Sequence, residues 1–261
     1  MKVSNPYFKQ ALRANEQVGA LEKSDAATKG GIFGKTIFLI LTTIAAGVIV
    51  AAILYSALVN KNTSTDQKIE IVSKLAIYLI VALIAMSISG VISALFPKTS
   101  FIAGPIYAVG VGSVLGVLCM IGEVFIKGIT VMAGAGTAIV FLVTLGGYAA
   151  GLKNHMSKIA AGALIIFLSV LIGEIVTLIF FSINPSADFP VGVLLLIEAI
   201  YLIYGCACLL MNFSEADAVV EQGFPKAYEW SVALGLLSSI VLIFIELFRL
   251  IILIASLAKK D

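Results

Sequence analysis

Residues Ile37–Leu58 read IFLILTTIAAGVIVAAILYSAL and carry no charged side chain. An α-helix rises 1.5 Å per residue, so a run of about 20 apolar residues crosses the roughly 30 Å hydrocarbon core of a bilayer. The Leu, Ile and Val residues are spread all around such a helix, as contact with lipid requires. The sequence therefore predicts an all-α, polytopic membrane protein with seven transmembrane helices in one bundle, because six further apolar runs follow: Leu75–Leu95, Pro105–Phe125, Ile129–Gly151, Ile159–Phe181, Val191–Met211 and Ala233–Leu257.

The composition of the chain supports this fold class. Of its 261 residues, 61% are hydrophobic and 12% are charged, whereas a soluble domain has roughly 45–50% apolar residues and about a quarter charged ones. These figures exclude a soluble globular domain, an intrinsically disordered chain and a disulfide-stapled secreted domain. The net charge of +2 is too small to indicate a nucleic-acid partner, so the expected surrounding is membrane lipid.

The distribution of basic residues predicts how the chain is oriented. Residues 1–35 form a polar N-terminal tail, followed by a transmembrane domain at 36–258. Lys and Arg are enriched in cytoplasmic segments, which predicts a cytoplasmic N-terminus and, with an odd number of spans, a C-terminus on the opposite side. Ten basic residues fall on the N-terminal side (Lys2, Lys9, Arg13, Lys23, Lys29, Lys35, Lys98, Lys153, Lys158 and Lys226) and six on the other (Lys61, Lys68, Lys74, Lys127, Lys259 and Lys260).

Five charged residues lie inside the predicted spans, and they are the first candidates for function. An ionisable group at bilayer depth costs roughly 2.5–3.5 kcal/mol on insertion scales, so each needs a partner or a watery cavity. A purely structural alternative is that the acids are protonated or hydrogen-bonded between helices. The five are Glu123, Glu174, Glu198, Glu246 and Arg249.

Two of the acids are predicted to lie at equal depth. Glu174 precedes Ser186, the centre of a short loop, by twelve residues, and Glu198 follows it by twelve. If their helix faces meet, the two carboxyl groups would share a proton, bind a cation or sense pH.

Glu246 and Arg249 stand three residues apart and therefore on one face of the last predicted helix. They form either a self-neutralising ion pair that allows insertion or a gate that opens when Arg249 releases Glu246. The sequence shows no pattern typical of a catalytic or metal site. His155 is the single histidine, and the cysteines have no metal-ligand spacing. We therefore predict no catalytic residue, no cofactor and no metal site, and no enzymatic activity.

Glycines in two spans fit the small-xxx-small pattern of closely packed membrane helices. These stretches are Gly112–Gly116 and Gly147–Gly151. Both predict close helix approach.

Four short stretches resemble the Bax inhibitor family, in its YccA-like bacterial branch. Members of that family are seven-helix membrane proteins, and some are associated with a pH-sensitive calcium leak. The resemblance thus implies location in the cell (inner) membrane and a cation pathway controlled by protonation. The stretches are Asn5–Phe8 (NPYF), Gly104–Tyr107 (GPIY), Met211–Trp230 with its GFPK and EW motifs, and Phe244–Leu250 (FIELFRL).

The resemblance also implies where a pH sensor would lie. Leak-forming members carry an aspartate pair on the sixth and seventh helices, whose positions fall here on Asn212 and Glu246. Asn212 cannot ionise, and the arginine that such members place in the second span has no counterpart in Leu75–Leu95. Proton sensing is therefore left to Glu246, Glu174 and Glu198.

Two functions of different classes remain open. The first is a pH-sensitive leak or transport protein for a cation such as Ca²⁺, which prefers oxygen ligands, with H⁺ as a second ligand. The alternative is a non-conducting protein that binds and regulates other membrane proteins. A proton-coupled solute transporter would be favoured by internal repeats, and the sequence shows no convincing one.

Overall fold

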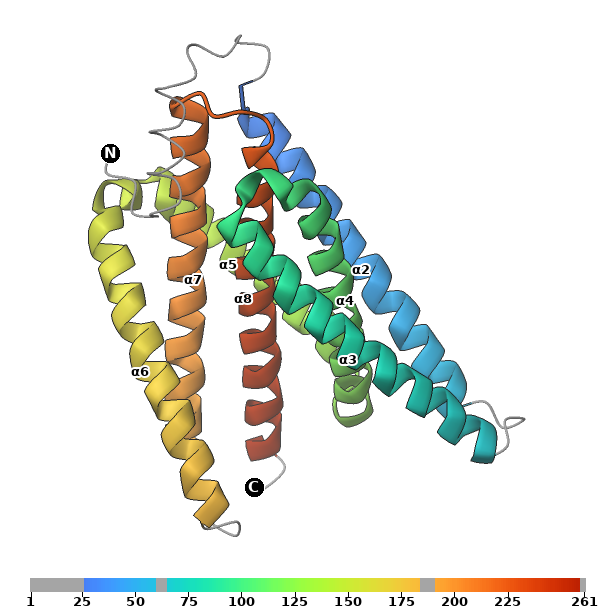
Figure 1. Ribbon diagram of the computed structural model, residues 1–261. Helices are drawn as coiled ribbons and strands as arrows, with labels where there is room; N and C mark the ends of the chain where they lie inside the picture. Colours follow the sequence, from blue (N-terminus) through green and yellow to red (C-terminus); the bar gives the residue numbers. More distant parts are fainter. Residues whose placement is uncertain (1–25, 60–64, 184–190, 259–261) are drawn as a thin grey trace. The chain divides into compact units, whose positions relative to one another are not determined.

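The computed structural model describes residues 26–59, 65–183 and 191–258, and these ranges are almost entirely helical (Figure 1). Seven of the described helices are long and apolar enough to cross a membrane, which confirms the predicted fold class. Short 3₁₀ turns, η2 (Pro97–Thr99) and η3 (Leu152–His155), precede α4 and α6. The long helices are α2 (Lys29–Val59), α3 (Thr65–Leu95), α4 (Ser100–Phe125), α5 (Ile129–Ala149), α6 (Met156–Ile183), α7 (Val191–Glu221) and α8 (Tyr228–Ala258).

Several helices extend beyond the apolar runs that predicted them. Helix α2 begins at Lys29, within the segment 1–35 that we predicted as a tail, and α7 continues past Met211 to Glu221. Hydropathy marks the part of a helix that suits lipid, whereas backbone hydrogen bonding continues into polar residues once a helix has formed. Several charged side chains are thereby placed on regular helix rather than in loops.

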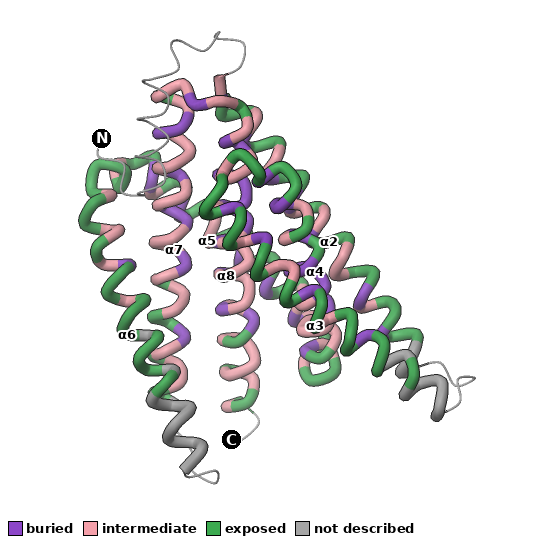
Figure 2. Tube along the Cα trace, viewed as in Figure 1, coloured by how far each residue is buried: buried purple, intermediate pink, exposed green. Residues whose placement is uncertain are grey.

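The chain divides into two compact units, and α7 and α8 each run through both. Within the described residues, the first unit comprises 26–127 and 216–237, and the second comprises 128–215 and 238–258. Figure 2 shows many exposed residues along α3 and the described part of α6. Most of these on α3 are large and apolar, such as Ile80, Ile84 and Ile88, as expected of helices that face lipid.

In the first unit, α4 packs against both α2 and α3. The α2–α4 contact is made by backbone, because a Cβ atom on Gly116 would collide with the carbonyl oxygen of Gly47, and one on Gly112 with that of Thr43. This confirms close approach at Gly112–Gly116. The same prediction is wrong for Gly151, which lies beyond the end of α5 with φ of +131° and, in the part of the chain that the structure describes, has no neighbour within 4 Å of a Cβ atom. It serves the turn rather than helix packing.

In the second unit, α7 contacts three other helices. Phe213 packs against Phe141 of α5 with ring centroids 5.6 Å apart, and Tyr204 stacks on Phe167 of α6 at 5.9 Å. A Cβ atom built on Gly205 would lie 3.0 Å from a side-chain carbon of Ile243 on α8. The face of α7 around Gly205 is therefore closely packed against α8.

Candidate functional site

Helices α7 and α8 are joined by a connection whose form is encoded in the Gly223-Phe224-Pro225 sequence. Gly223 adopts φ of +65°, its amide donates to the carbonyl of Val220, and the amide of Phe224 donates to that of Val219. These two bonds are the Schellman pattern, which satisfies the last carbonyl groups of a helix and ends it. The chain is thereby returned into α8, so that two successive long helices can bring their polar side chains together.

Arg249 of α8 lies between two buried carboxylates of the second unit. Its Nη2 atom is 2.9 Å from Oε1 of Glu198 on α7, and its Nη1 atom is 3.6 Å from Oε2 of Glu246 on its own helix. The side chains of Glu198 and Glu246 are 10% and 4% exposed, whereas that of Arg249 is 44% exposed. The guanidinium also lies 5.6 Å from the ring centre of Tyr201, one turn along α7 from Glu198. We call Glu198, Glu246 and Arg249 the ionic triad.

The ionic triad combines two carboxyl groups with one guanidinium. The Oε2 atom of Glu198 is buried with no hydrogen-bond partner among the described residues. Arginine suits this position because its planar group can contact two acids at once. Chemically, the arrangement can take up a proton, or exchange the guanidinium for another cation.

A second polar contact joins α7 and α8 away from the ionic triad. The Nδ2 atom of Asn212 donates to Oγ of Ser239 at 2.5 Å. Asn212 is 14 residues beyond Glu198, or about 21 Å along α7. Glu246 lies seven residues beyond Ser239, about 10 Å further along α8. The structure thus places Asn212 and Glu246, the two positions singled out by the resemblance, in separate polar contacts.

The remaining acids of the predicted spans have different surroundings. The backbone of Glu174 belongs to α6, but its side chain lies outside the described residues, so the Glu174–Glu198 pair stays a prediction. Glu123 is half-buried near the end of α4 in the first unit. Across the described ranges, no group of three or more His, Cys, Asp or Glu side chains could hold a metal ion.

Comparison with known proteins places the chain in a family. A family model described as Bax inhibitor 1 like matches residues 5–256. The chain belongs to the Bax inhibitor 1-like family. Searches of curated proteins and of solved structures found no match.

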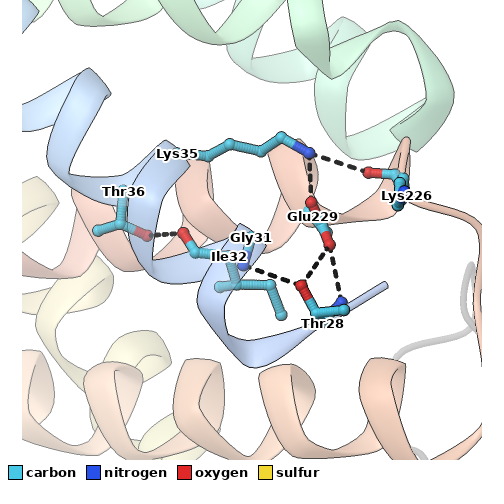
Figure 3. A network of polar contacts seen from close by, with 7 residues as sticks. All are labelled: Thr28, Gly31, Ile32, Lys35, Thr36, Lys226 and Glu229. Carbon is cyan, nitrogen blue, oxygen red and sulfur yellow. Dashed lines mark hydrogen bonds and ion pairs between the residues drawn. The ribbon is translucent and has the colours of Figure 1, made fainter. Parts of the chain in front are cut away.

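In this Bax inhibitor 1-like protein, sequence reasoning missed a third buried carboxylate with ionic contacts. Glu229, in the first turn of α8, pairs with Lys35 of α2 and accepts hydrogen bonds from Thr28 (Figure 3). Lys35 belongs to the segment 1–35 that the sequence predicts as a tail, and the two residues are 194 positions apart. The sequence does contain one indication of Glu229, which is the Glu229-Trp230 motif. There an acidic residue stands beside an aromatic residue at the start of an apolar run.

Proposed function

We propose that this multi-pass membrane protein is a pH-sensitive cation leak or transport protein, with Ca²⁺ the first cation to test. The observation that carries the proposal is the ionic triad, in which one guanidinium is shared by two buried carboxylates on apolar helices. Ionisable groups are expensive at bilayer depth. Two carboxyl groups and a guanidinium in contact with one another therefore support a functional role for these residues.

In this proposal, Arg249 acts as a tethered cation. Its guanidinium occupies the carboxylate oxygens that a mobile cation would otherwise use, and oxygen atoms are the ligands that Ca²⁺ prefers. Protonation of Glu198 or Glu246 removes one of the charges that hold Arg249 in place. The balance between proton, guanidinium and mobile cation would then set the flux.

We extend the proposal to location and orientation. The motif stretches support the YccA-like branch and hence a cell (inner) membrane location. The ten-to-six distribution of Lys and Arg supports a cytoplasmic N-terminus. Membrane lipid is the expected surrounding of the exposed apolar faces.

The proposal is tested with purified protein in liposomes that contain a calcium dye. Ca²⁺ influx should change with pH, and Glu246→Gln should reduce that pH dependence because it removes one titrating group of the ionic triad. Glu123→Gln is the matched control, since it removes a carboxylate from another helix in the first unit, and its flux should follow the unmodified protein.

Absence of flux at every pH would contradict this proposal. The remaining function would then be that of a non-conducting protein that binds other membrane proteins. That alternative is tested by deleting residues 1–25 and measuring the capture of other membrane proteins. Deletion of residues 1–35 would be unsuitable, because Thr28 and Lys35 belong to the contacts that α2 makes with α8.

A further inference from the structure

A polar clasp joins the start of α2 to the start of α8 in the first unit (Figure 3). The Glu229 carboxylate accepts the backbone amide of Thr28 at 2.7 Å and its hydroxyl at 3.3 Å, and it pairs with the Lys35 ammonium. Lys35 also donates to the carbonyl of Lys226 at 3.2 Å and lies 5.4 Å from the ring centre of Trp230. We define the clasp as these side chains of Thr28, Lys35 and Glu229.

Glu229 has two functions in the clasp. The Thr28 hydroxyl accepts the amide of Gly31 at 3.0 Å, which is the capping bond of a helix N-terminus. The Glu229 carboxylate, which lies on α8, adds to that cap by accepting the Thr28 amide. It is also close to Lys35 and to the positive end of the α2 dipole. Its side chain is only 4% exposed, so its charge is balanced by these groups rather than by water.

The segment held by the clasp is intrinsically a poor helix. α2 begins Lys29-Gly30-Gly31-Ile32-Phe33-Gly34, and glycine is the least favourable helix residue after proline. Gly31 has a steric reason, because a Cβ atom there would collide with the Glu229 carboxylate. Gly30 and Gly34 have none among the described residues, since no atom of these lies within 4 Å of a Cβ atom built on either. Glycine at these two positions weakens the helix without improving its packing.

We infer that the clasp is a releasable latch on the first two turns of α2. While Glu229 is engaged, residues 28–35 are helical and docked on α8. When its contacts are lost, these turns open as one local unit while the rest of the first unit stays folded. The reason is that a glycine-rich segment is held mainly by polar contacts, which are the clasp, the Lys29–Asp217 ion pair and the Ala27 amide bond to Phe224, with Ile32 as its buried apolar residue. Segments with few buried apolar contacts form the low-stability end of a protein. This inference is independent of the proposed cation pathway.

Amide hydrogen exchange of the full-length protein in lipid nanodiscs tests the latch. In Glu229→Gln, which keeps the shape but removes the charge, exchange in the peptide 27–36 should accelerate about ten- to a hundredfold, the loss expected for a charged hydrogen-bonded contact. Gly31→Ala should accelerate the same peptide, because its methyl group displaces the carboxylate. The two effects should be less than additive when combined, since both act on one contact.

Gly30→Ala and Gly34→Ala are the matched controls, one turn or less from Gly31. Each should slow exchange of the same peptide by about fivefold, the helix preference of alanine over glycine. Exchange in α4 should be unchanged in all four variants. Two results would contradict the latch. One is unchanged exchange of the 27–36 peptide in Glu229→Gln. The other is faster exchange in both α4 and the 27–36 peptide, which would mean that Glu229 stabilises the whole unit rather than one segment.

Discussion

Arg249 shows at the residue scale how a membrane helix can accommodate a positively charged side chain. The guanidinium lies 2.9 Å from Glu198 and 3.6 Å from Glu246, so removal of either acid leaves less compensation for a group that lipid cannot solvate. Charged contacts of this kind contribute about 1.5–3 kcal/mol when water cannot replace them.

We predict that a double-mutant cycle between Glu198→Gln and Arg249→Gln gives a coupling free energy of about 1.5–3 kcal/mol. The measurement is reversible unfolding in detergent micelles. The cycle between Glu198→Gln and Ser239→Ala is the control, because Ser239 lies about 15 Å from Arg249 along α8. Coupling below about 0.5 kcal/mol for Glu198 and Arg249 would mean that the contact is not formed.

Asn212 supports a second prediction at this scale. Asn212→Asp keeps an oxygen beside Ser239 but adds a group that can ionise inside the bilayer. The ionised form is disfavoured there by roughly 2.5–3.5 kcal/mol, so the variant should lose stability as pH rises from 5 to 8. Asn212→Ala is the control and should show no such slope beyond that of the unmodified protein. Equal slopes for the two variants would contradict the premise that the side chain at position 212 lies within the apolar part of the bilayer.

These residues also show which contacts sequence can predict. The Glu246–Arg249 contact follows from i, i+3 spacing, because helix geometry alone brings those side chains together. The Glu198–Arg249 contact was not predicted, since it depends on how α7 and α8 are rotated about their axes. The same limit applies to the contact between Lys35 and Glu229, because no local pattern links two residues 194 positions apart.

At the scale of elements, α2 and α4 associate through glycine backbone. A Cβ atom on Gly116 would meet the Gly47 carbonyl group, which cannot move aside as a flexible side chain can. Interfaces of small residues are the usual means of close approach between membrane helices, because lipid supplies no hydrophobic drive for their association.

We predict that Gly116→Ala destabilises the protein by about 1–3 kcal/mol through overpacking. Gly134→Ala and Gly146→Ala on α5 are the controls, because no atom of the described residues lies within 4 Å of a Cβ atom at either position, and both should be neutral or stabilising. Thermal unfolding of the three variants in one detergent measures the difference. Equal melting temperatures for Gly116→Ala and the controls would argue against the α2–α4 contact.

The number and order of the elements were predicted from the apolar runs, but their ends were not. Apolar residues mark each span because lipid selects them, so all seven runs correspond to described helices. The first helix begins at Lys29 and the sixth span continues to Glu221 because polar ends are stabilised by caps and contacts such as those of Thr28 and Gly223. These caps are local but involve polar residues and glycine, so they leave no signal in the apolar pattern, and the Thr28–Glu229 contact joins distant parts of the chain.

At the scale of the whole molecule, membrane topology is the first prediction. We predict that an odd number of spans places the two ends on opposite sides and that the excess of Lys and Arg keeps the N-terminus in the cytoplasm. The test uses single-cysteine variants at Val3 or Ala258 in a background without Cys119, Cys206 and Cys208. An impermeant maleimide should label position 3 only in inside-out vesicles and position 258 only in right-side-out vesicles. Labelling of both ends from one side would contradict the span number, and labelling of Val3 from outside would contradict the orientation.

Ca²⁺ influx into liposomes that contain Arg249→Gln tests the central claim most directly. If the guanidinium competes with a mobile cation for Glu198 and Glu246, its removal should raise influx several-fold at neutral pH. Arg249→Lys, which retains a tethered charge, should remain near the unmodified protein. Influx that is unchanged or lower in Arg249→Gln, in protein that is folded and reconstituted equally well, would contradict a cation pathway controlled by the ionic triad.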